Sequence, residues 1–277
     1  MQLRPSTHHA GALLGLALSA LIGAMVFSSS TADAAPMSPS AVASWKSTHD
    51  TDPHLALPAA ELTQLDQRQQ AASSWHQVLV AGARSDAADA TPAATSSDIV
   101  ANQQGQINGY YCGPAAVSEA LGALGVSLTQ SSAGSLLQTT ADEGTSWSGL
   151  DINVPKTTGY PVADLINYES GGWYAPVSVP YQPAAGDDTT YVNDLTYDID
   201  HKWPLVGDAW EVPNGPHLVG HPNIEIFHWF EIRGYENAGS TTDYEDSATT
   251  VWSGIPPYSS LSSQTIVTIV GGRGYVW

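Results

Sequence analysis

The fold of this chain is decided by the stretch Gln106-Ile-Asn-Gly-Tyr-Tyr-Cys112-Gly-Pro-Ala-Ala116, which holds the only cysteine among 277 residues. The Gly-Pro step after Cys112 forces a turn and then presets a helical φ angle. We therefore expect Cys112 at the N-terminus of a helix that ends near residues 122–125. Unpaired N–H groups and the macrodipole favour a thiolate there, and a lone cysteine cannot form an internal disulfide. The stretch predicts a reactive thiol.

Gln106 lies six residues before Cys112, on the loop that leads into the predicted helix. An amide donor at this place is suited to meet an oxyanion that forms beside the sulfur. The nucleophile and the oxyanion donor would then share one loop.

The N-terminal end has the features of a secretory signal peptide. Arg4 precedes an apolar stretch over residues 10–27, and Ala32-Asp33-Ala34 forms an Ala-x-Ala cleavage site. We expect residues 1–34 to be removed and the protein to be secreted to the extracellular space. The alternative is a retained N-terminal anchor, for which the apolar stretch is short.

Composition limits the class of partner. The formal net charge is −19, yet only 13% of the residues are charged and 42% are hydrophobic, including nine Trp and twelve Tyr. This balance is typical of a globular chain with aromatic-rich faces rather than a disordered acidic one. The negative charge would repel nucleic acid and anionic membrane surfaces, so neither is expected as a partner. We expect a monomer.

Residues 35–98 are expected to form an appendage to the main domain, residues 99–277. Stretches rich in Ala, Ser, Pro and Thr at 35–44 and 85–98 look like linkers, and one amphipathic helix is predicted between Pro58 and residue 80. Two interpretations of this helix stay open. It packs on the back of the domain, or it belongs to a prosegment that lies over the active-site cleft.

The main domain places predicted helices first and strands later, which is typical of an α+β fold. After the cysteine helix, two weaker helices are predicted, and residues 191–201 fit either a strand or a short helix. The predicted helices cover 128–140 and 162–168, and the predicted strands cover 174–180, 204–209, 224–235, 242–252 and 265–277. The pair 224–235 and 242–252 is expected to form a hairpin. A cleft between the helical half and the antiparallel sheet is the natural place for a site.

His228 is the most informative histidine. Period-2 alternation puts it on the face of Ile226, Phe230 and Ile232, which is the core side of its strand. A single inward histidine in a strand is often only a core residue. Together with Cys112, however, it is expected to act as the general base and acid of nucleophilic catalysis.

A third group should orient the imidazole, and the returning strand offers Asp246. A symmetric hairpin that turns at Ala238-Gly239 would pair His228 with Thr249, so a bulge or an asymmetric turn is required to bring Asp246 opposite. The neighbouring acids Asp243 and Glu245 are expected to be solvated charges.

These segments together carry a family resemblance. They are Gln-x5-Cys-Gly-Pro-Ala with a following Leu-Gly-x-Leu-Gly, then His-Trp-Phe-x-Ile-x-Gly-Tyr, then Tyr-x-Asp-Ser-Ala. Over residues 99–277 the chain resembles the papain-like cysteine peptidases related to bacteriocin-processing (double-glycine leader) peptidases, in a secreted, stand-alone form. The resemblance implies a papain-like α+β fold, with the cysteine helix packed on a C-terminal antiparallel sheet.

By the same resemblance, Cys112 is the nucleophile, His228 the general base and acid, Asp246 the orienting group and Gln106 the oxyanion donor. A peptide or protein substrate is then expected, cleaved through a thioester. The papain-type Cys-Gly-Ser-Cys-Trp signature is absent, and this chain lacks the P-loop and membrane spans of the exporters that clip leader peptides. Leader processing is therefore not implied. Two alternatives stay open: a transglutaminase-like acyl transferase, or an inactive module that binds peptide or cell-wall polymer.

Other chemistries find little support in the sequence. No Gly-x-Ser-x-Gly elbow occurs, and His217 and His221 lie between glycines and prolines that forbid a metal-binding helix. The acids at 187–200 lack the pattern of an EF-hand and are expected to form a solvated face. No metal and no cofactor are expected.

Overall fold

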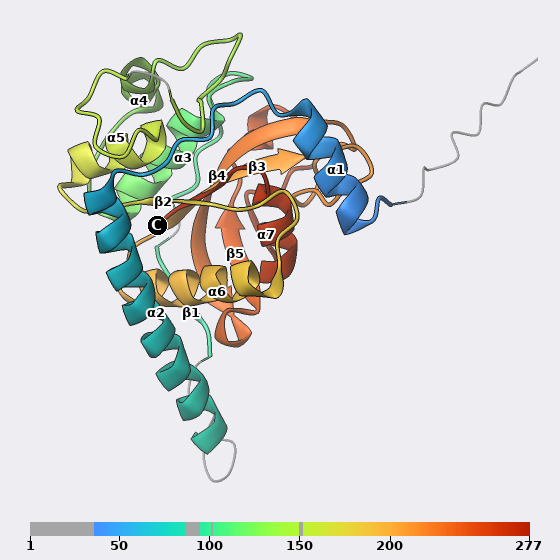
Figure 1. Cartoon of the computed structure of the whole chain (residues 1–277). Helices are drawn as coiled ribbons and strands as arrows, with labels where there is room; N and C mark the ends of the chain where they lie inside the picture. Colours follow the sequence, from blue (N-terminus) through green and yellow to red (C-terminus); the bar gives the residue numbers. More distant parts are fainter. Residues whose placement is uncertain (1–35, 87–94, 101, 150–151) are drawn as a thin grey trace, which may run out of the picture. The chain divides into compact units, whose positions relative to one another are not determined.

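An antiparallel sheet organises the described part of the chain, as the computed structural model in Figure 1 shows. The structure describes residues 36–86, 95–100, 102–149 and 152–277, so the expected signal peptide lies outside the described residues. The strand order is β2-β7-β3-β4-β5-β6, and β1 pairs with β4 as well. The strands are β1 (Ser97–Asp98), β2 (Pro176–Ser178), β3 (Leu205–Glu211), β4 (Ile226–Glu236), β5 (Thr241–Glu245), β6 (Tyr258–Ser262) and β7 (Gly274–Val276).

Helices cover both faces of this sheet. The helices are α1 (Pro39–His49), α2 (Ala59–Asp86), α3 (Cys112–Ala123), α4 (Gln130–Leu137), α5 (Pro161–Ser170), α6 (Ala185–Asp200) and α7 (Ser263–Val270). The cluster of α3, α4 and α5 packs on one face, and α6 and α7 pack on the other. An α+β fold with the cysteine helix packed on an antiparallel sheet is thereby confirmed.

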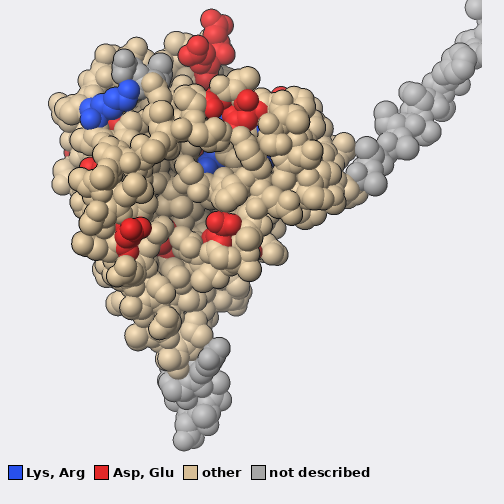
Figure 2. Space-filling model, viewed as in Figure 1, with Lys and Arg blue, Asp and Glu red and all other residues tan. Residues whose placement is uncertain are grey.

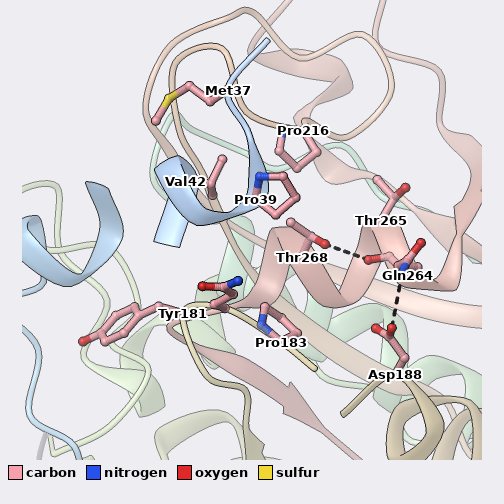
Figure 3. Close-up of a pocket in the computed structure, with 11 residues that line it drawn as sticks. Met37, Pro39, Val42, Tyr181, Pro183, Asp188, Pro216, Gln264, Thr265 and Thr268 are labelled. Carbon is pink, nitrogen blue, oxygen red and sulfur yellow. Dashed lines mark hydrogen bonds between the residues drawn. The ribbon is translucent and has the colours of Figure 1, made fainter. Parts of the chain in front are cut away.

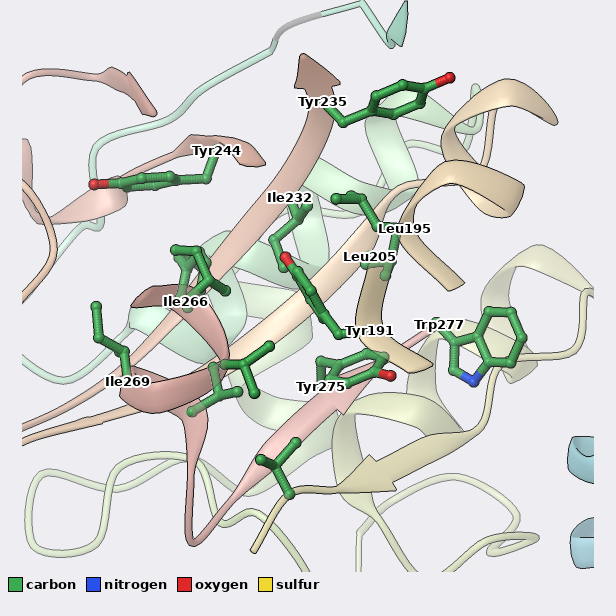
Figure 4. Close-up of a cluster of buried hydrophobic side chains, with 14 of the residues drawn as sticks. Tyr191, Leu195, Leu205, Ile232, Tyr235, Tyr244, Ile266, Ile269, Tyr275 and Trp277 are labelled. Atoms are coloured by element: carbon green, nitrogen blue, oxygen red, sulfur yellow. The ribbon is translucent and has the colours of Figure 1, made fainter. Parts of the chain in front are cut away.

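Alternation along the central strands explains why both faces are apolar. In β4, Phe230 and Ile232 pack toward α6 and α7, whereas Trp229, just before Phe230, joins the cluster around α3. Figure 4 shows Ile232 beside Leu195 of α6 and Tyr191, with Ile266 nearby. His228 is buried at the start of this strand, next to the core residue Trp229, and this packing restricts its position.

The prediction of a strand over residues 265–270 is wrong, because this segment is the helix α7. The side chain of Ser262 caps the helix by accepting a hydrogen bond from the backbone N–H of Thr265. Ile266, Val267, Ile269 and Val270 are all buried, and their spacing fits one helical face. The cap and this spacing outweigh the strand propensity of a β-branched run. Residues 274–276 do form the predicted last strand.

The linker expected at 35–44 is also wrong in part, because helix α1 begins at Pro39. Ser38 accepts a hydrogen bond from the N–H of Ala41, and Pro occupies the first turn, where its missing N–H costs nothing. Lys46 is buried and donates to the carbonyls of Thr268, Ile269 and Gly271 at the end of α7, at 3.0, 2.9 and 2.6 Å. The helix is therefore docked on the sheet domain.

Residues 185–200 form the helix α6, which corrects the expected solvated face. Asp194 and Asp198 are fully buried in it. The hydroxyl of Tyr275 donates to Asp194 at 2.7 Å, and Arg68 of α2 pairs with Asp198. These acids attach α6 to the sheet and to α2. Figure 2 shows acidic side chains as separate groups on a mostly uncharged face.

Candidate active site

Cys112 begins α3, as predicted, and its side chain is buried against the sheet. Its N-cap residue, Tyr111, makes no side-chain capping bond, so the first N–H groups of the helix stay available. Burial raises the pKa of Cys112, but the hydrogen bond and charge of His228 and the N–H groups of Trp229 and Gly113 outweigh it. The pKa of the thiol therefore lies below its ordinary value, which favours a thiolate.

His228 and Asp246 are brought together, as predicted. Nε2 of His228 lies 3.1 Å from Oδ1 of Asp246, which leaves Nδ1 for the bond to the Cys112 sulfur. Burial lowers the pKa of His228, but the charge and hydrogen bond of Asp246 and the contact with Cys112 raise it well above its usual value. The same histidine charge keeps the pKa of Asp246 below its ordinary range despite burial. The geometry supports a thiolate–imidazolium pair held by a carboxylate.

A bulge is present in β4, as the sequence required, but it shifts the pairing by one residue only, and the rest of the displacement of Asp246 comes from the turn that follows β5. Near the turn, Glu236 pairs with Thr241, but beyond a bulge between Ile232 and Gly234 the pairing shifts, so that Glu231 faces Glu245. The extra residue in β4 moves the partner of His228 one position closer to the turn than Thr249. Asp246 then leaves β5 as the cap of a short 3₁₀ turn, where the N–H of Ala248 donates to its Oδ1 at 2.8 Å. This turn aims the carboxylate back at the imidazole.

A second histidine stands behind Asp246 and was missed by the sequence reasoning. Nε2 of His221 lies 3.0 Å from Oδ2 of Asp246, and its Nδ1 lies 2.9 Å from Oε1 of Glu211. The side chains of His221 and Glu211 are fully buried. Burial lowers the pKa of His221, but the hydrogen bonds to Asp246 and Glu211 raise it above its ordinary value. Acidic and basic side chains therefore alternate from Cys112 to Glu211.

One signal in the sequence pointed to this second histidine. Glu211 ends the apolar strand β3, and an acid in such a strand needs a buried partner. The loop between β3 and β4 supplies His221. The prolines of this loop exclude a metal site on a helix. They do not prevent the loop from folding back over the ends of the strands, where His221 meets Glu211.

Gln106 is buried beside the segment that follows Asp246. Its Oε1 accepts from the hydroxyl of Ser247 at 3.3 Å, and its Nε2 donates to the carbonyl of Asn108 at 2.7 Å. An amide nitrogen carries two hydrogens, so one donor remains beyond this bond. The carboxamide is held on the loop that precedes Cys112.

Glu245 is fully buried, which corrects the expectation of a solvated charge, whereas Asp243 is half-buried and accepts from Ser260. Oxygen atoms of Glu245, Glu231 of β4 and Glu119 of α3 lie within 4.8 Å of one another. Burial, followed by the charges of Glu245 and Glu119, raises the pKa of Glu231 well above its usual value. A raised pKa favours the protonated, uncharged form of the Glu231 carboxyl group.

A pocket of about 500 Å³ opens directly at Cys112. Aromatic side chains of Trp147, Phe227 and Trp229 line it, together with the loop at 142–146 and Asp208 of β3. Residues 51–52, which connect α1 to α2, also reach this pocket. The connection is fixed across the molecule, because the Ser148 hydroxyl donates to the carbonyl of Pro53 at 2.6 Å.

A second hollow, of about 400 Å³, lies between α1 and α7 (Figure 3). Its lining includes Met37, Val42 and Thr268, and its one acid, Asp188, accepts from Gln264 at 3.4 Å. It contains neither the thiol nor a histidine among its lining residues. The pocket at Cys112 is therefore the candidate active site.

Comparison with solved structures gives distant likenesses, of which two are described. One is a Bacillus anthracis protein provisionally described as a C39-like peptidase, with 9% identity, 65% of this chain and 96% of that chain covered, and a TM-score of 0.42. The other is the peptidase domain of Streptococcus ComA, a bifunctional ABC transporter involved in a quorum-sensing pathway, with 13% identity, 62% and 93% covered, and a TM-score of 0.38. No family model matches the chain, and no curated protein does. Within the described residues, none of the helices combines the length and hydrophobicity that a membrane crossing requires.

Proposed function

We propose that this protein is a cysteine peptidase that hydrolyses peptide bonds through a Cys-His-Asp thioester mechanism. The observation that carries the proposal is the contact of Cys112 with His228, whose Nε2 lies 3.1 Å from Asp246. A buried thiol, an imidazole and a carboxylate in this order match the roles of nucleophile, base and orienting group.

In the acylation step, the thiolate of Cys112 attacks the carbonyl carbon, and the electron pair of the C=O bond moves to oxygen. Free N–H groups at the start of α3 and the second amide hydrogen of Gln106 are proposed to stabilise this oxyanion. When the intermediate collapses, His228 gives its Nδ1 proton to the departing amine, the C–N bond breaks and a thioester remains.

In the deacylation step, water attacks the thioester while His228 takes the proton of the water. Collapse of the second intermediate breaks the C–S bond, releases the acid and restores the thiolate. Asp246 keeps Nε2 protonated throughout, so that Nδ1 is the nitrogen that exchanges protons. The imidazole thus serves as acid in one step and as base in the next.

We further propose that the protein acts outside the cell. The support is the sequence of the N-terminal end, with its apolar stretch over 10–27 and the Ala32-Asp33-Ala34 site. N-terminal sequencing of protein collected from culture medium should give Ala35 as the first residue. A first residue within 1–34, or retention in the membrane fraction, would contradict export.

The thiol offers a direct test, because iodoacetamide can label only one cysteine in this chain. Wild-type protein should be labelled rapidly at pH 6 to 7, since the thiolate is already formed. His228→Ala should be labelled slowly at this pH and should recover speed only above pH ~8.5, the ordinary thiol range. His201→Ala, which changes an exposed histidine, is the control and should behave like wild type.

Activity is tested with a peptide library analysed by mass spectrometry. Wild-type protein should cleave a subset of peptides, and Cys112→Ser should leave the library intact. If wild type leaves the library intact as well, or if His228→Ala is labelled as fast as wild type, the peptidase proposal is wrong.

A further inference from the structure

The pocket beside Cys112 has an acidic floor and rim. Asp208 of β3 lies at the buried floor, and Asp142 and Glu143 lie on an exposed loop at the rim. Register in the sheet explains the position of Asp208, because it pairs with Trp229 on one side and Gly274 on the other. Trp229 and Asp208 therefore project from the same face of the sheet into the pocket.

The one basic residue that lines this pocket is already neutralised. Nη1 of Arg273 lies 3.0 Å from Asp50, and its Nη2 lies 3.2 Å from Asp52. These two carboxylates compensate the guanidinium charge, so the exposed acids Asp142 and Glu143 leave an excess of negative charge at the rim, and the carboxyl group of Asp208 remains as an acceptor at the floor.

Asp208 is buried without a hydrogen-bonding partner. Its exposed fraction is 3%, and across the described ranges no group donates a hydrogen bond to its carboxylate. A buried carboxylate without a donor is costly, and such a group facing a cavity is suited to a donor that arrives with a ligand. Burial raises the pKa of Asp208 well above its usual value, and the charge of Arg273 opposes this only in part.

We propose that this pocket binds a cationic side chain, arginine or lysine, of the substrate residue next to the scissile bond. This inference rests on the proposed function, because only a peptidase has a bond to be cleaved next to the bound side chain. Binding of the side chain itself does not require hydrolysis. The guanidinium or ammonium group would donate to Asp208 while Trp147, Trp229 and Phe227 surround its stem and face its charge. The exposed acids at 142–143 would attract the cation from solution.

Binding is tested on the Cys112→Ser variant, so that turnover plays no part. The probes are N-acetyl-arginine amide and its neutral isostere, N-acetyl-citrulline amide, compared by ligand-observed NMR or calorimetric titration. We expect the arginine probe to bind at least about tenfold more tightly, which corresponds to ~1.4 kcal/mol. Adding Asp208→Asn should remove this preference, whereas adding Asp66→Asn, which changes an exposed acid on α2, should keep it.

The same preference should appear in cleavage if the proposed function also holds. Peptides with arginine or lysine next to the cleaved bond should be enriched among wild-type products, and Asp208→Asn should lower kcat/KM for them while sparing neutral peptides. Should Asp208→Asn fail to fold, the double variant Asp142→Asn/Glu143→Gln on the exposed rim must weaken the preference for the arginine probe.

The outcomes separate the two proposals. Equal binding of the arginine and citrulline probes to Cys112→Ser, or no binding of either, overturns the cationic pocket whether or not peptides are cleaved. A clear arginine preference together with an intact peptide library keeps the pocket and overturns the peptidase.

Discussion

At the scale of single residues, the site is a row of buried side chains in which acidic and basic groups alternate. His221 is placed between two carboxylates, Asp246 and Glu211, and therefore holds Asp246 from the side opposite His228. A carboxylate fixed on both oxygens cannot rotate, and a rigid carboxylate fixes the imidazole that must face Cys112. His221 is in this sense a positioning residue that acts through Asp246.

The variant His221→Gln tests this role. The glutamine amide is neutral, so Asp246 loses one charge-assisted hydrogen bond, worth about 1.5–3 kcal/mol. We therefore expect kcat/KM to fall roughly 10- to 100-fold. The pKa of Asp246 should rise toward its ordinary value, so the acidic limb of the pH–rate profile should move to higher pH.

The matched control is His217→Gln. Nε2 of His217 lies 3.8 Å from Glu211, and His217 makes no hydrogen bond to Asp246 in the described structure. Its replacement should leave the pH profile in place. A profile for His221→Gln that coincides with wild type, at unchanged folding by circular dichroism, would show that His221 only fills space.

At the scale of elements, the position of Asp246 could be predicted only in part. The strand pair and its turn follow from period-2 alternation and Ala238-Gly239, and counting from this turn already shows that a bulge is needed. The location of the bulge, at Arg233 between Ile232 and Gly234, depends on packing against β1 and α6, which no local pattern records.

Two failures of sequence reasoning have the same physical origin. The run at 265–270 has strand propensity, and the acids of α6 have surface propensity, yet tertiary contacts decide both. Asp194 is buried because the hydroxyl of Tyr275 donates to it, and Asp198 because Arg68 pairs with it. These partners lie more than 80 residues away in sequence, so a local pattern cannot reveal them.

The contact between α2 and α6 yields a prediction at this scale. Arg68 pairs with the buried Asp198, donates to the carbonyl of Trp173 at 2.8 Å, and stacks its guanidinium 4.4 Å from the ring of Trp277. Arg68→Ala leaves the acid buried without its cation, so the free energy of unfolding measured in urea should fall by about 3–5 kcal/mol. Gln67→Ala, at an exposed position of the same helix, should change it little.

The pH dependence of this loss is a second check on Arg68→Ala. Burial raises the pKa of Asp198 to about 6 even with Arg68 present, and removal of the arginine raises it further. The acid is therefore protonated at pH 5 in the variant, and the loss of stability should be smaller at pH 5 than at pH 8. An equal loss at both values would mean that Arg68 acts through its ring contacts rather than through Asp198.

At the scale of the whole molecule, this fold differs from an acidic protein whose carboxyl groups all lie on the surface, because several of its acids are buried. Burial raises the pKa of Glu119, Asp194, Asp208 and Glu231 well above the usual values. A group whose pKa is raised by folding contributes stability that is complete below its unfolded pKa and is lost as pH rises through its folded pKa. The high pKa of His228 acts in the same direction.

We therefore expect the protein to unfold at a higher urea concentration at pH 5 than at pH 8. Groups with a lowered pKa act in the opposite sense: His76 and Cys112 do so within this window, and Asp50, Asp246 and Lys46 do so outside it or near its edge, but the groups with a raised pKa outnumber them. Asp246 has a lowered pKa, so its contribution is lost only in stronger acid, and Lys46, with a pKa of about 7, gains stability only as pH rises above that value. The sum between pH 5 and pH 7 is set by the buried carboxyls.

Glu231→Gln isolates one of them. An amide has the shape of the protonated acid and never needs to ionise, so the variant should match wild type near pH 5 and exceed its stability at pH 8. Urea unfolding at the two pH values measures this difference directly. Glu61→Gln is the control, because Glu61 is half-buried in α2 and accepts a hydrogen bond from the indole of Trp173. A Glu231→Gln variant that is less stable than wild type at pH 8 would mean that the cluster with Glu119 and Glu245 holds a cation rather than protons, because only an ionised Glu231 would then contribute.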